Sequence, residues 1–449
     1  MHGGAATAPL RFIPESIYPS ARQSTVSSAA TIIRRDRRKA HHIFPEEDPM
    51  TNQERIQARI ARSKARREAK KRARAEQYGQ LEKVFTNQNL FKSLMKRRKG
   101  TDWKQSVMDY MFHAIVRNKR TKDAILAGAH PEPNKIKRIS LYERGKRRDV
   151  HAVVIDSRVI QGVLCDNCIT PLTKPGLIHD NPASTTGKGV TWARNRMLHH
   201  IRKQYRKTGD KTCALVFDIR RFFDSIPHAL CEKIFRDIYL DERLISLAMH
   251  FIRMYQVFDA RLKKDDEKIA SLDRLEGIGV SLGSQISQVL ALCAPNAMDH
   301  FVKDAAGVIP YMRYMDDGYI AGGKAEMLQL RRDLMDRAAA IGFSLHDTKT
   351  RVVKMSRGIV YLKIRYSVTE TGHVIRRIAR EGIVRMRRKL KKLHGLYLAG
   401  KVSLDDVFLS VKSWLGNAKK YTNSYRTRKR ILSLYHQLFR SYRMEGVIA

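Results

Sequence analysis

The sequence has few cysteines, a deficit of acidic residues and no long apolar run. Its five cysteines form no disulfide framework, so we expect a chain of the cytoplasm, where thiols stay reduced. No apolar run approaches the roughly 18 to 20 residues that a membrane span requires, so no membrane partner is expected. Cys165 and Cys168 have metal-ligand spacing, but a structural zinc needs four ligands and no convincing second pair exists.

The scarcity of acids leaves a large excess of positive charge. Lys and Arg outnumber Asp and Glu 87 to 44 in 449 residues, which gives a formal net charge of +43. Such a surface repels itself unless a polyanion lies along it. Nucleic acid is the expected partner.

Composition divides the chain into five segments. Residues 1–49 lack apolar periodicity and are predicted to be a disordered, dispensable extension, unless Met50 is the true initiator or the segment is a transit peptide, which Glu15 disfavours. Residues 50–80 are predicted to form a basic helical arm, because 53–76 contain ten basic and three acidic residues among strong helix formers. The arm either is a solvated helix or orders on phosphate.

The remaining segments predict an α+β fold. Helical periodicity begins near residue 81, and "KIKRISLYERGKRRDVHAVVID" predicts a basic β-hairpin. Buried strands are predicted over 212–219 and 308–315, with helices between them and no dinucleotide fingerprint. After Arg376 the chain reads as helical, with nineteen basic and three acidic residues over 376–443.

Three aspartates stand at the ends of the predicted strands. Asp218 ends one strand in "LVFDIRR", and Asp316 and Asp317 end the other in "YMRYMDDGY". Each alone could be an ordinary strand end or turn. Together, three converging carboxylates could hold a pair of Mg²⁺ ions about 3.5 to 4 Å apart, the apparatus of nucleotidyl transfer.

Here a resemblance becomes specific. "FDIRRFFDSIPH", "GVSLGSQISQ" and "YMRYMDDGY" resemble motifs A, B and C of reverse transcriptases, in the same order, and "IGFSLHDTKT" and "GIVYLK" resemble motifs D and E. "GKRRDV" with "DSRVIQ" resembles the fingers block of group II intron-like bacterial enzymes. The resemblance implies a right-hand polymerase fold with fingers over 81–210, a palm with an antiparallel sheet over 211–365, and a basic helical thumb over 366–449.

The resemblance also implies roles for individual residues. Asp218, Asp316 and Asp317 would be catalytic acids that bind two Mg²⁺ ions, or Mn²⁺ as a substitute, with the Ile219 carbonyl as a further ligand; Lys349 would protonate the leaving pyrophosphate. The expected dNTP-binding residues are Lys146, Arg148, Phe223, Gly283 and Gln288. Phe223 would exclude a 2′-hydroxyl, unless it is a plain core aromatic beside Phe222.

The function that the resemblance implies is RNA-directed DNA polymerase, with an RNA template, dNTPs and a cDNA product. The alternatives are an RNA-binding maturase or chaperone with a vestigial site, and a polymerase that is template-independent or makes RNA. The "SQ" ending of motif B resembles diversity-generating retroelement, prophage and defence-associated enzymes. We expect one dedicated structured RNA as partner, with Tyr421, Tyr425, Tyr435 and Tyr442 either stacking on its bases or packing the thumb core. The oligomeric state and the biological role stay open.

Overall fold

The computed structural model describes residues 51–131, 136–143, 146–265, 277–421 and 424–440. The predicted extension over 1–49 lies outside the described residues. The chain divides into two units, residues 1–64 and 65–449. A single helix, α1 (Asn52–Tyr78), confirms the predicted basic helix over 53–76, and only Ala75 of this helix is buried. No helix among the described residues has the length and apolarity to cross a membrane.

A helical layer and a β-hairpin follow α1. Leu90 and Leu94 pack against Val159 and Val163 in one hydrophobic core, because apolar residues recur at helical spacing on both segments. The predicted hairpin is confirmed, with β1 and β2 paired antiparallel in full register. The elements of this region are α2 (Leu81–Val84), α3 (Asn87–Arg97), α4 (Gln105–Phe112), α5 (Ala114–Leu126), β1 (Ile136–Glu143), β2 (Lys146–Val153), α6 (Ile155–Leu164) and α7 (Thr170–Thr173).

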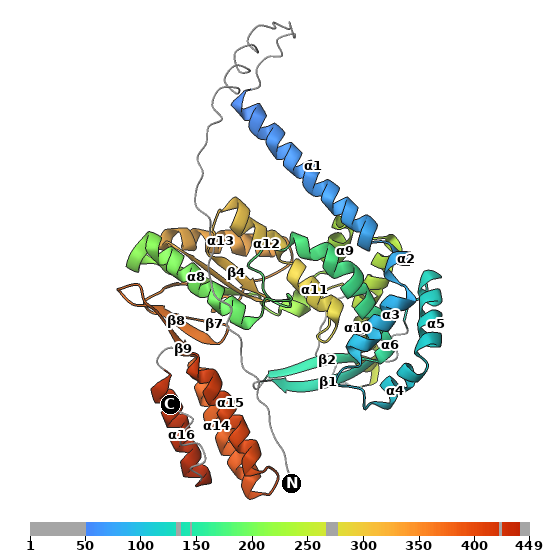
Figure 1. The fold of residues 1–449 in the computed structure, drawn as a ribbon. Coiled ribbons are helices and arrows are strands. Elements are labelled where there is room, and N and C mark those ends of the chain that lie inside the picture. The colour runs from blue at the N-terminus through green and yellow to red at the C-terminus, as the bar shows by residue number, and fades with distance from the viewer. Residues whose placement is uncertain (1–50, 132–135, 144–145, 266–276, 422–423, 441–449) are drawn as a thin grey trace, which may run out of the picture. The chain divides into compact units, whose positions relative to one another are not determined.

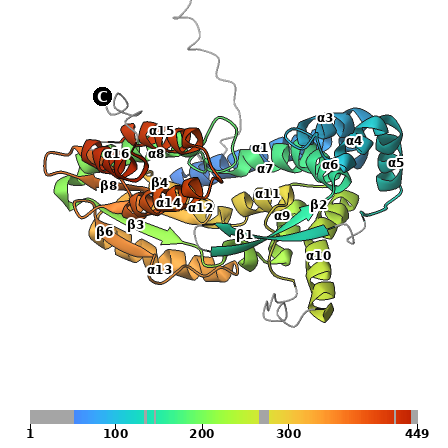
Figure 2. The ribbon, with the colours of Figure 1, turned by 90° about the horizontal axis from the view of Figure 1, so that it is seen from below.

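A four-stranded antiparallel sheet occupies the middle of the second unit (Figure 1). Its strands lie in the order β4 (Tyr311–Tyr314), β5 (Asp317–Gly322), β3 (Cys213–Asp218), β6 (Arg351–Lys354). Helix α8 (Val190–Thr208) covers one face and α13 (Lys324–Ala340) the other, as Figure 2 shows for α13. The predicted strands over 212–219 and 308–315 are thereby confirmed.

Side chains alternate between the two faces of this sheet. Met312 and Tyr319 belong to the core beneath α8, whereas Tyr311, Ile320 and Leu215 belong to the core beneath α13. Because both faces are covered by helices, the strands are apolar at nearly every position. The helices between the strands are α9 (His228–Asp237), α10 (Glu242–Asp265), α11 (Gln285–Cys293) and α12 (Asn296–His300).

The C-terminal region begins with strands. β7 (Ile359–Tyr361), β8 (Ile364–Val368) and β9 (Val374–Ile378) form a separate antiparallel sheet. The expectation of a helical segment from residue 366 is therefore wrong for the first thirteen residues, because β8 pairs with β7 on one side and with β9 on the other. Three helices follow and stand together in Figure 1, α14 (Arg380–Leu398), α15 (Leu404–Lys419) and α16 (Tyr425–Phe439).

The three C-terminal helices share a core of their own. Leu390, Val411 and Tyr435 are fully or almost fully buried in it. Tyr435 therefore packs the helical core and is not a base-stacking residue. Tyr425 is exposed, Tyr421 is buried, and Tyr442 lies outside the described residues.

Candidate active site

The three predicted acids meet at one end of the central sheet. Asp218, the last residue of β3, pairs directly with Asp317, the first residue of β5. Asp316 lies in the two-residue turn between β4 and β5, and its carbonyl accepts a hydrogen bond of 3.1 Å from the Ile219 amide. The antiparallel register therefore brings together carboxylates that are about one hundred residues apart in the sequence.

The electrostatics of the three acids reflect crowding of like charges. Burial raises the pKa of Asp317 to about 7, and the neighbouring charges of Asp316 and Asp218 contribute to the rise. Burial likewise raises the pKa of Asp316, with Asp218 adding to it. Desolvation and like charge both disfavour the ionised form, so the site is short of positive charge.

One cation partly meets this shortage. The Lys349 ammonium donates a hydrogen bond to Asp218 Oδ2, and its side chain is about half exposed. Lys349 thus lies beside Asp218, with which it forms an ion pair. The main-chain amide of His346, in the same loop, donates to the Asp218 carbonyl at 2.8 Å.

A divalent metal fits the donor set. Carboxylate oxygens are the ligands that Mg²⁺ and Mn²⁺ prefer. Burial and like charge raise the pKa values of Asp316 and Asp317 despite the nearby Lys349, so a bound cation would stabilise their ionised forms. Among the described residues, no group of three or more His, Cys, Asp or Glu side chains is already gathered around a metal position.

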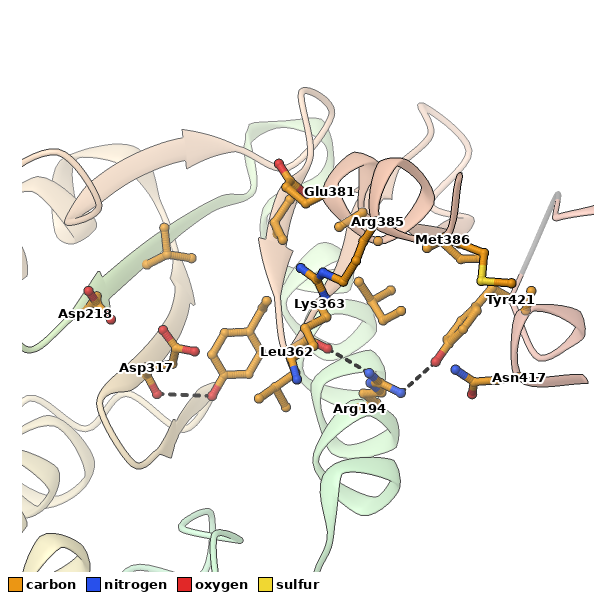
Figure 3. A pocket seen from close by; sticks show the side chains of 18 of the residues that line it. Arg194, Asp218, Asp317, Leu362, Lys363, Glu381, Arg385, Met386, Asn417 and Tyr421 are labelled. Atoms are coloured by element: carbon orange, nitrogen blue, oxygen red, sulfur yellow. Dashed lines mark hydrogen bonds between the residues drawn. The ribbon is translucent and has the colours of Figure 1, made fainter. Parts of the chain in front are cut away.

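A large open cavity adjoins the acids. Its volume is about 980 Å³, and its lining runs from Asp218 and Asp317 across the β7–β8 turn to α14 and α15 (Figure 3). Arg385 and Lys389 of α14 contribute positive charge to the wall opposite the acids. The α14 wall is basic overall, because Arg385 and Lys389 outnumber Glu381, whereas Lys349 and Arg351 stand with Asp218 and Asp317 at the other end.

Phe222 and Phe223 have different environments. Phe222 is 5% exposed and packs against Phe343 with ring centroids 5.7 Å apart. Phe223 is only partly buried, lies edge-on to Phe222, and its carbonyl accepts a hydrogen bond from Val280. Phe222 is thus the core aromatic, and Phe223 keeps an accessible face.

The predicted fingers cations lie on β2. Arg148 is exposed, and its positive charge offsets a small part of the burial-driven rise in the pKa of Asp316, so its guanidinium acts on this acid across the site. Lys146 begins β2, but its side chain lies outside the described residues.

Gly283, the glycine of motif B, packs against the β1–β2 hairpin. Gly283 has φ 102°, and a Cβ there would lie 2.8 Å from Val150 Cγ1 and 3.0 Å from the His151 carbonyl oxygen. The His151 amide also donates to the Leu282 carbonyl at 3.1 Å. Glycine is therefore required for close packing against β2, which the sequence did not reveal. Gln288, on α11, is exposed.

Two arginines that the sequence patterns did not single out support the turns around the acids. Arg313 donates to the Met315 carbonyl at 2.9 Å, and Arg194 donates to the Leu362 carbonyl at 2.8 Å. Both contacts depend on the fold. The only sequence signal for either residue is that Arg313 lies within the "YMRYMDD" motif.

No curated protein matches the sequence. Among solved structures, an apo telomerase from Candida tropicalis, truncated from its C-terminal domain, has a TM-score of 0.38 and 13% identity, covering 54% of this chain and 55% of that chain. The chain thus spans about half the length of that structure. The family model "Reverse transcriptase (RNA-dependent DNA polymerase)" matches residues 136–366, which is more than half of the 449 residues. The chain belongs to the reverse transcriptase family.

Proposed function

We propose that the chain is an RNA-directed DNA polymerase that extends a primer 3′-hydroxyl with deoxynucleotides on an RNA template. The observation that carries the proposal is the cross-strand pairing of Asp218 with Asp317 beside Asp316. Asp218 and Asp317 lie at one end of a cavity whose other end is basic. A vestigial site would not need three crowded anions, because like charges at short distance cost free energy without a bound cation.

The proposed cofactor is a pair of Mg²⁺ ions, with Mn²⁺ as a substitute. Asp218, Asp316, Asp317 and the Ile219 carbonyl would hold them. Such ions activate an attacking oxygen and stabilise the leaving phosphate oxygens. A metal ion on Asp218 would replace the ion pair between Asp218 and Lys349. Lys349 would then be free to donate a proton to the leaving pyrophosphate.

The nucleotide would lie between β2 and the acids. Arg148 suits a triphosphate, because its planar guanidinium donates two parallel hydrogen bonds to phosphate oxygens, and Lys146 would add a second cation. The accessible face of Phe223 would exclude a 2′-hydroxyl. Gly283 and Gln288 of motif B would complete the pocket.

Primer extension tests the proposal. Asp218→Ala and Asp316→Ala should each lower deoxynucleotide incorporation by at least about a thousandfold, which corresponds to about 4 kcal/mol of transition-state stabilisation. Asp336→Ala, which removes an exposed acid of α13, is the matched control and should retain wild-type activity. RNA binding should persist in all three variants. Extension by either catalytic variant at the wild-type rate would refute the active-site assignment.

Sugar selection has its own test. Phe223→Val should admit ribonucleotides, because the smaller side chain leaves room for a 2′-hydroxyl. Phe222→Leu is the control, since Phe222 is the buried partner. Discrimination that stays unchanged in Phe223→Val would identify Phe223 as merely structural, and a wild-type enzyme that prefers ribonucleotides would identify a polymerase of other sugar specificity.

The proposed partner is one dedicated structured RNA rather than any transcript. Positive charge extends well beyond the cavity: helix α8 has six Lys and Arg residues and no acid. Its inward face, with Ala193 and Met197, is buried on the sheet, whereas Arg202 and Arg206 are exposed. This is more phosphate-binding surface than a short primer–template duplex needs.

Charge reversal on α8 tests this surface. Arg202→Glu/Arg206→Glu should weaken RNA binding and reduce the slope of log affinity against log salt by about 2, since each lost phosphate contact removes about 1. Lys324→Glu/Arg332→Glu on α13 changes the net charge equally and should leave the slope unchanged. Crosslinking and sequencing of bound RNA in the host should enrich one RNA encoded near the gene, and reads scattered over abundant transcripts would contradict a dedicated partner.

The finer classification is also a proposal. The "GVSLGSQISQ" motif supports a prokaryotic enzyme related to diversity-generating retroelement, prophage or defence-associated reverse transcriptases. The cysteines, all free and buried, support the cytoplasm as the site of action.

A further inference from the structure

Two β-hairpin turns at the cavity contain non-glycine residues in the left-handed region. In the β4–β5 turn, Met315 has φ 57°, and in the β7–β8 turn, Leu362 and Lys363 have φ 46° and 68°. We call these the acid turn and the grip turn. A residue with a Cβ pays roughly 1–2 kcal/mol for such a conformation, and it persists only where the surroundings hold it.

Arg313 holds the acid turn from inside the protein. Its Nη1 donates to the Met315 carbonyl at 2.9 Å, while Nε and Nη2 donate to the Asp299 carboxylate at 2.8 and 2.7 Å. Nη2 also donates to the carbonyl of Leu292, in the last turn of α11. The side chains of Arg313 and Asp299 are fully buried.

This arrangement ties two helices to one turn. Burying a charged pair costs several kcal/mol of desolvation, so such a pair is weak evidence for stability. The guanidinium nevertheless joins Leu292 of α11 and Asp299 of α12 to the carbonyl of the residue that immediately precedes Asp316. A displacement of Arg313 would therefore displace a catalytic carboxylate.

Arg194 holds the grip turn from the cavity side. Its Nη2 donates to the Leu362 carbonyl at 2.8 Å and its Nη1 to the Tyr421 hydroxyl at 2.6 Å. Figure 3 shows both contacts, with Arg194 reaching from α8 between the turn and the C-terminal region. Arg194 thus joins α8, the β7–β8 turn and Tyr421, two residues beyond the end of α15.

We infer that Arg313 and Arg194 are positioning residues with separate tasks, Arg313 for the chemical step and Arg194 for retention of the primer–template. The inference rests on the proposed polymerase function. Arg313 sets the orientation of Asp316 through the Met315 carbonyl. Arg194 sets the angle between the grip turn and the helices α14 and α15, which line the basic end of the cavity.

Arg313→Lys tests the first task, because lysine keeps the charge but lacks the planar fork. The rate of single-nucleotide addition from a preformed complex should fall by about 10- to 100-fold. Mn²⁺ binding to the free protein, measured by electron paramagnetic resonance, should weaken by roughly 10- to 100-fold, as for other partners of metal ligands. The dissociation rate of the primer–template should stay at the wild-type value.

Arg194→Leu tests the second task, because leucine keeps apolar bulk and removes both donors. Primer–template dissociation, followed with an unlabelled trap, should accelerate about tenfold, which corresponds to about 1.4 kcal/mol, and products should be shorter. Mn²⁺ binding and the single-nucleotide rate should not change. Arg194→Lys should restore part of the product length.

Arg313→Lys and Arg194→Leu are controls for each other. Two phenylalanine variants separate the individual contacts of the two arginines. Tyr311→Phe removes a hydroxyl that donates to Asp299 without touching the Arg313 contact to the turn, and it should leave Mn²⁺ binding intact. Tyr421→Phe removes one of the two Arg194 contacts and should give a smaller effect than Arg194→Leu.

Defined outcomes would overturn the inference. Equal losses of chemistry and retention in both arginine variants would indicate a purely structural role, as would wild-type Mn²⁺ binding and rate in Arg313→Lys. Wild-type dissociation in Arg194→Leu would refute the second task. A wild-type protein that extends no primer would instead refute the proposed function, while Mn²⁺ binding and dissociation would still report on the two turns.

Discussion

The acid turn and the grip turn both contain non-glycine residues in the left-handed region, but different surroundings hold them. Both are two-residue hairpins with non-glycine residues at positive φ, and in both an arginine donates to a main-chain carbonyl. Arg313 is fully buried and has an ionic partner, whereas Arg194 lies at the cavity and has a neutral phenol as partner. The difference indicates that the acid turn is built for fixed geometry and the grip turn for contact with a large ligand.

Removing the ionic partner of Arg313 should have the largest effect. Asp299→Ala leaves a guanidinium buried without a counter-charge, and we expect a loss of roughly 3–5 kcal/mol in the free energy of unfolding. Chemical denaturation measures this loss. Asp304→Ala, which removes an exposed carboxylate paired with His300, should cost less than about 1 kcal/mol. A similarly small cost for Asp299→Ala would mean that the acid turn is not held from within.

The acid turn should also depend on the glycine that follows it. A Cβ at Gly318 would lie 2.0 Å from Phe217 Cζ across the strand pair, so Gly318→Ala should cost about 1–3 kcal/mol through overpacking and should lower activity. Adding Phe217→Leu should restore part of both. If the double variant is no better than Gly318→Ala, the clash with Phe217 is not the cause.

The strain in the grip turn can be measured directly. Lys363→Gly should be more stable than Lys363→Ala by roughly 0.5–1 kcal/mol, because glycine avoids the left-handed penalty and returns only part of it as chain entropy. The alanine variant is the control, since both changes remove the lysine side chain. Equal stabilities would show that the grip turn is unstrained, unlike the acid turn.

A pH dependence is also expected next to the acid turn. The pKa of Asp317 is raised by burial to about 7, whereas an unfolded Asp has a pKa of about 3.9. The folded state therefore binds more protons, so the contribution of Asp317 to metal-free stability is greatest below about pH 4 and is lost as the pH rises through about 7. Mn²⁺ binding should strengthen over the same range.

Denaturation and Mn²⁺ titration between pH 5 and 8 check this dependence. Asp317→Asn should abolish the stability change, because the amide does not titrate. A stability that instead increases across this range would contradict the raised pKa.

Much of the fold could be predicted from local patterns. The hairpin over β1 and β2, the strands β3 and β4 and the helix α1 all follow from apolar periodicity and turn residues, which act between near neighbours. The β7–β9 sheet did not follow from local patterns, because its short strands contain basic residues such as Arg365 and Arg376 that hide the alternation.

The sequence by itself determined which residues are the candidates for the chemistry, because aspartates at strand ends and the order of the motifs are local features. Only the tertiary structure decided that Asp218 pairs with Asp317, that Gly283 packs against β2, and that Arg194 meets Leu362 and Tyr421. These contacts join residues separated by about 100 to 230 positions. Their formation depends on strand register and on the packing of α8, which no short stretch of sequence specifies.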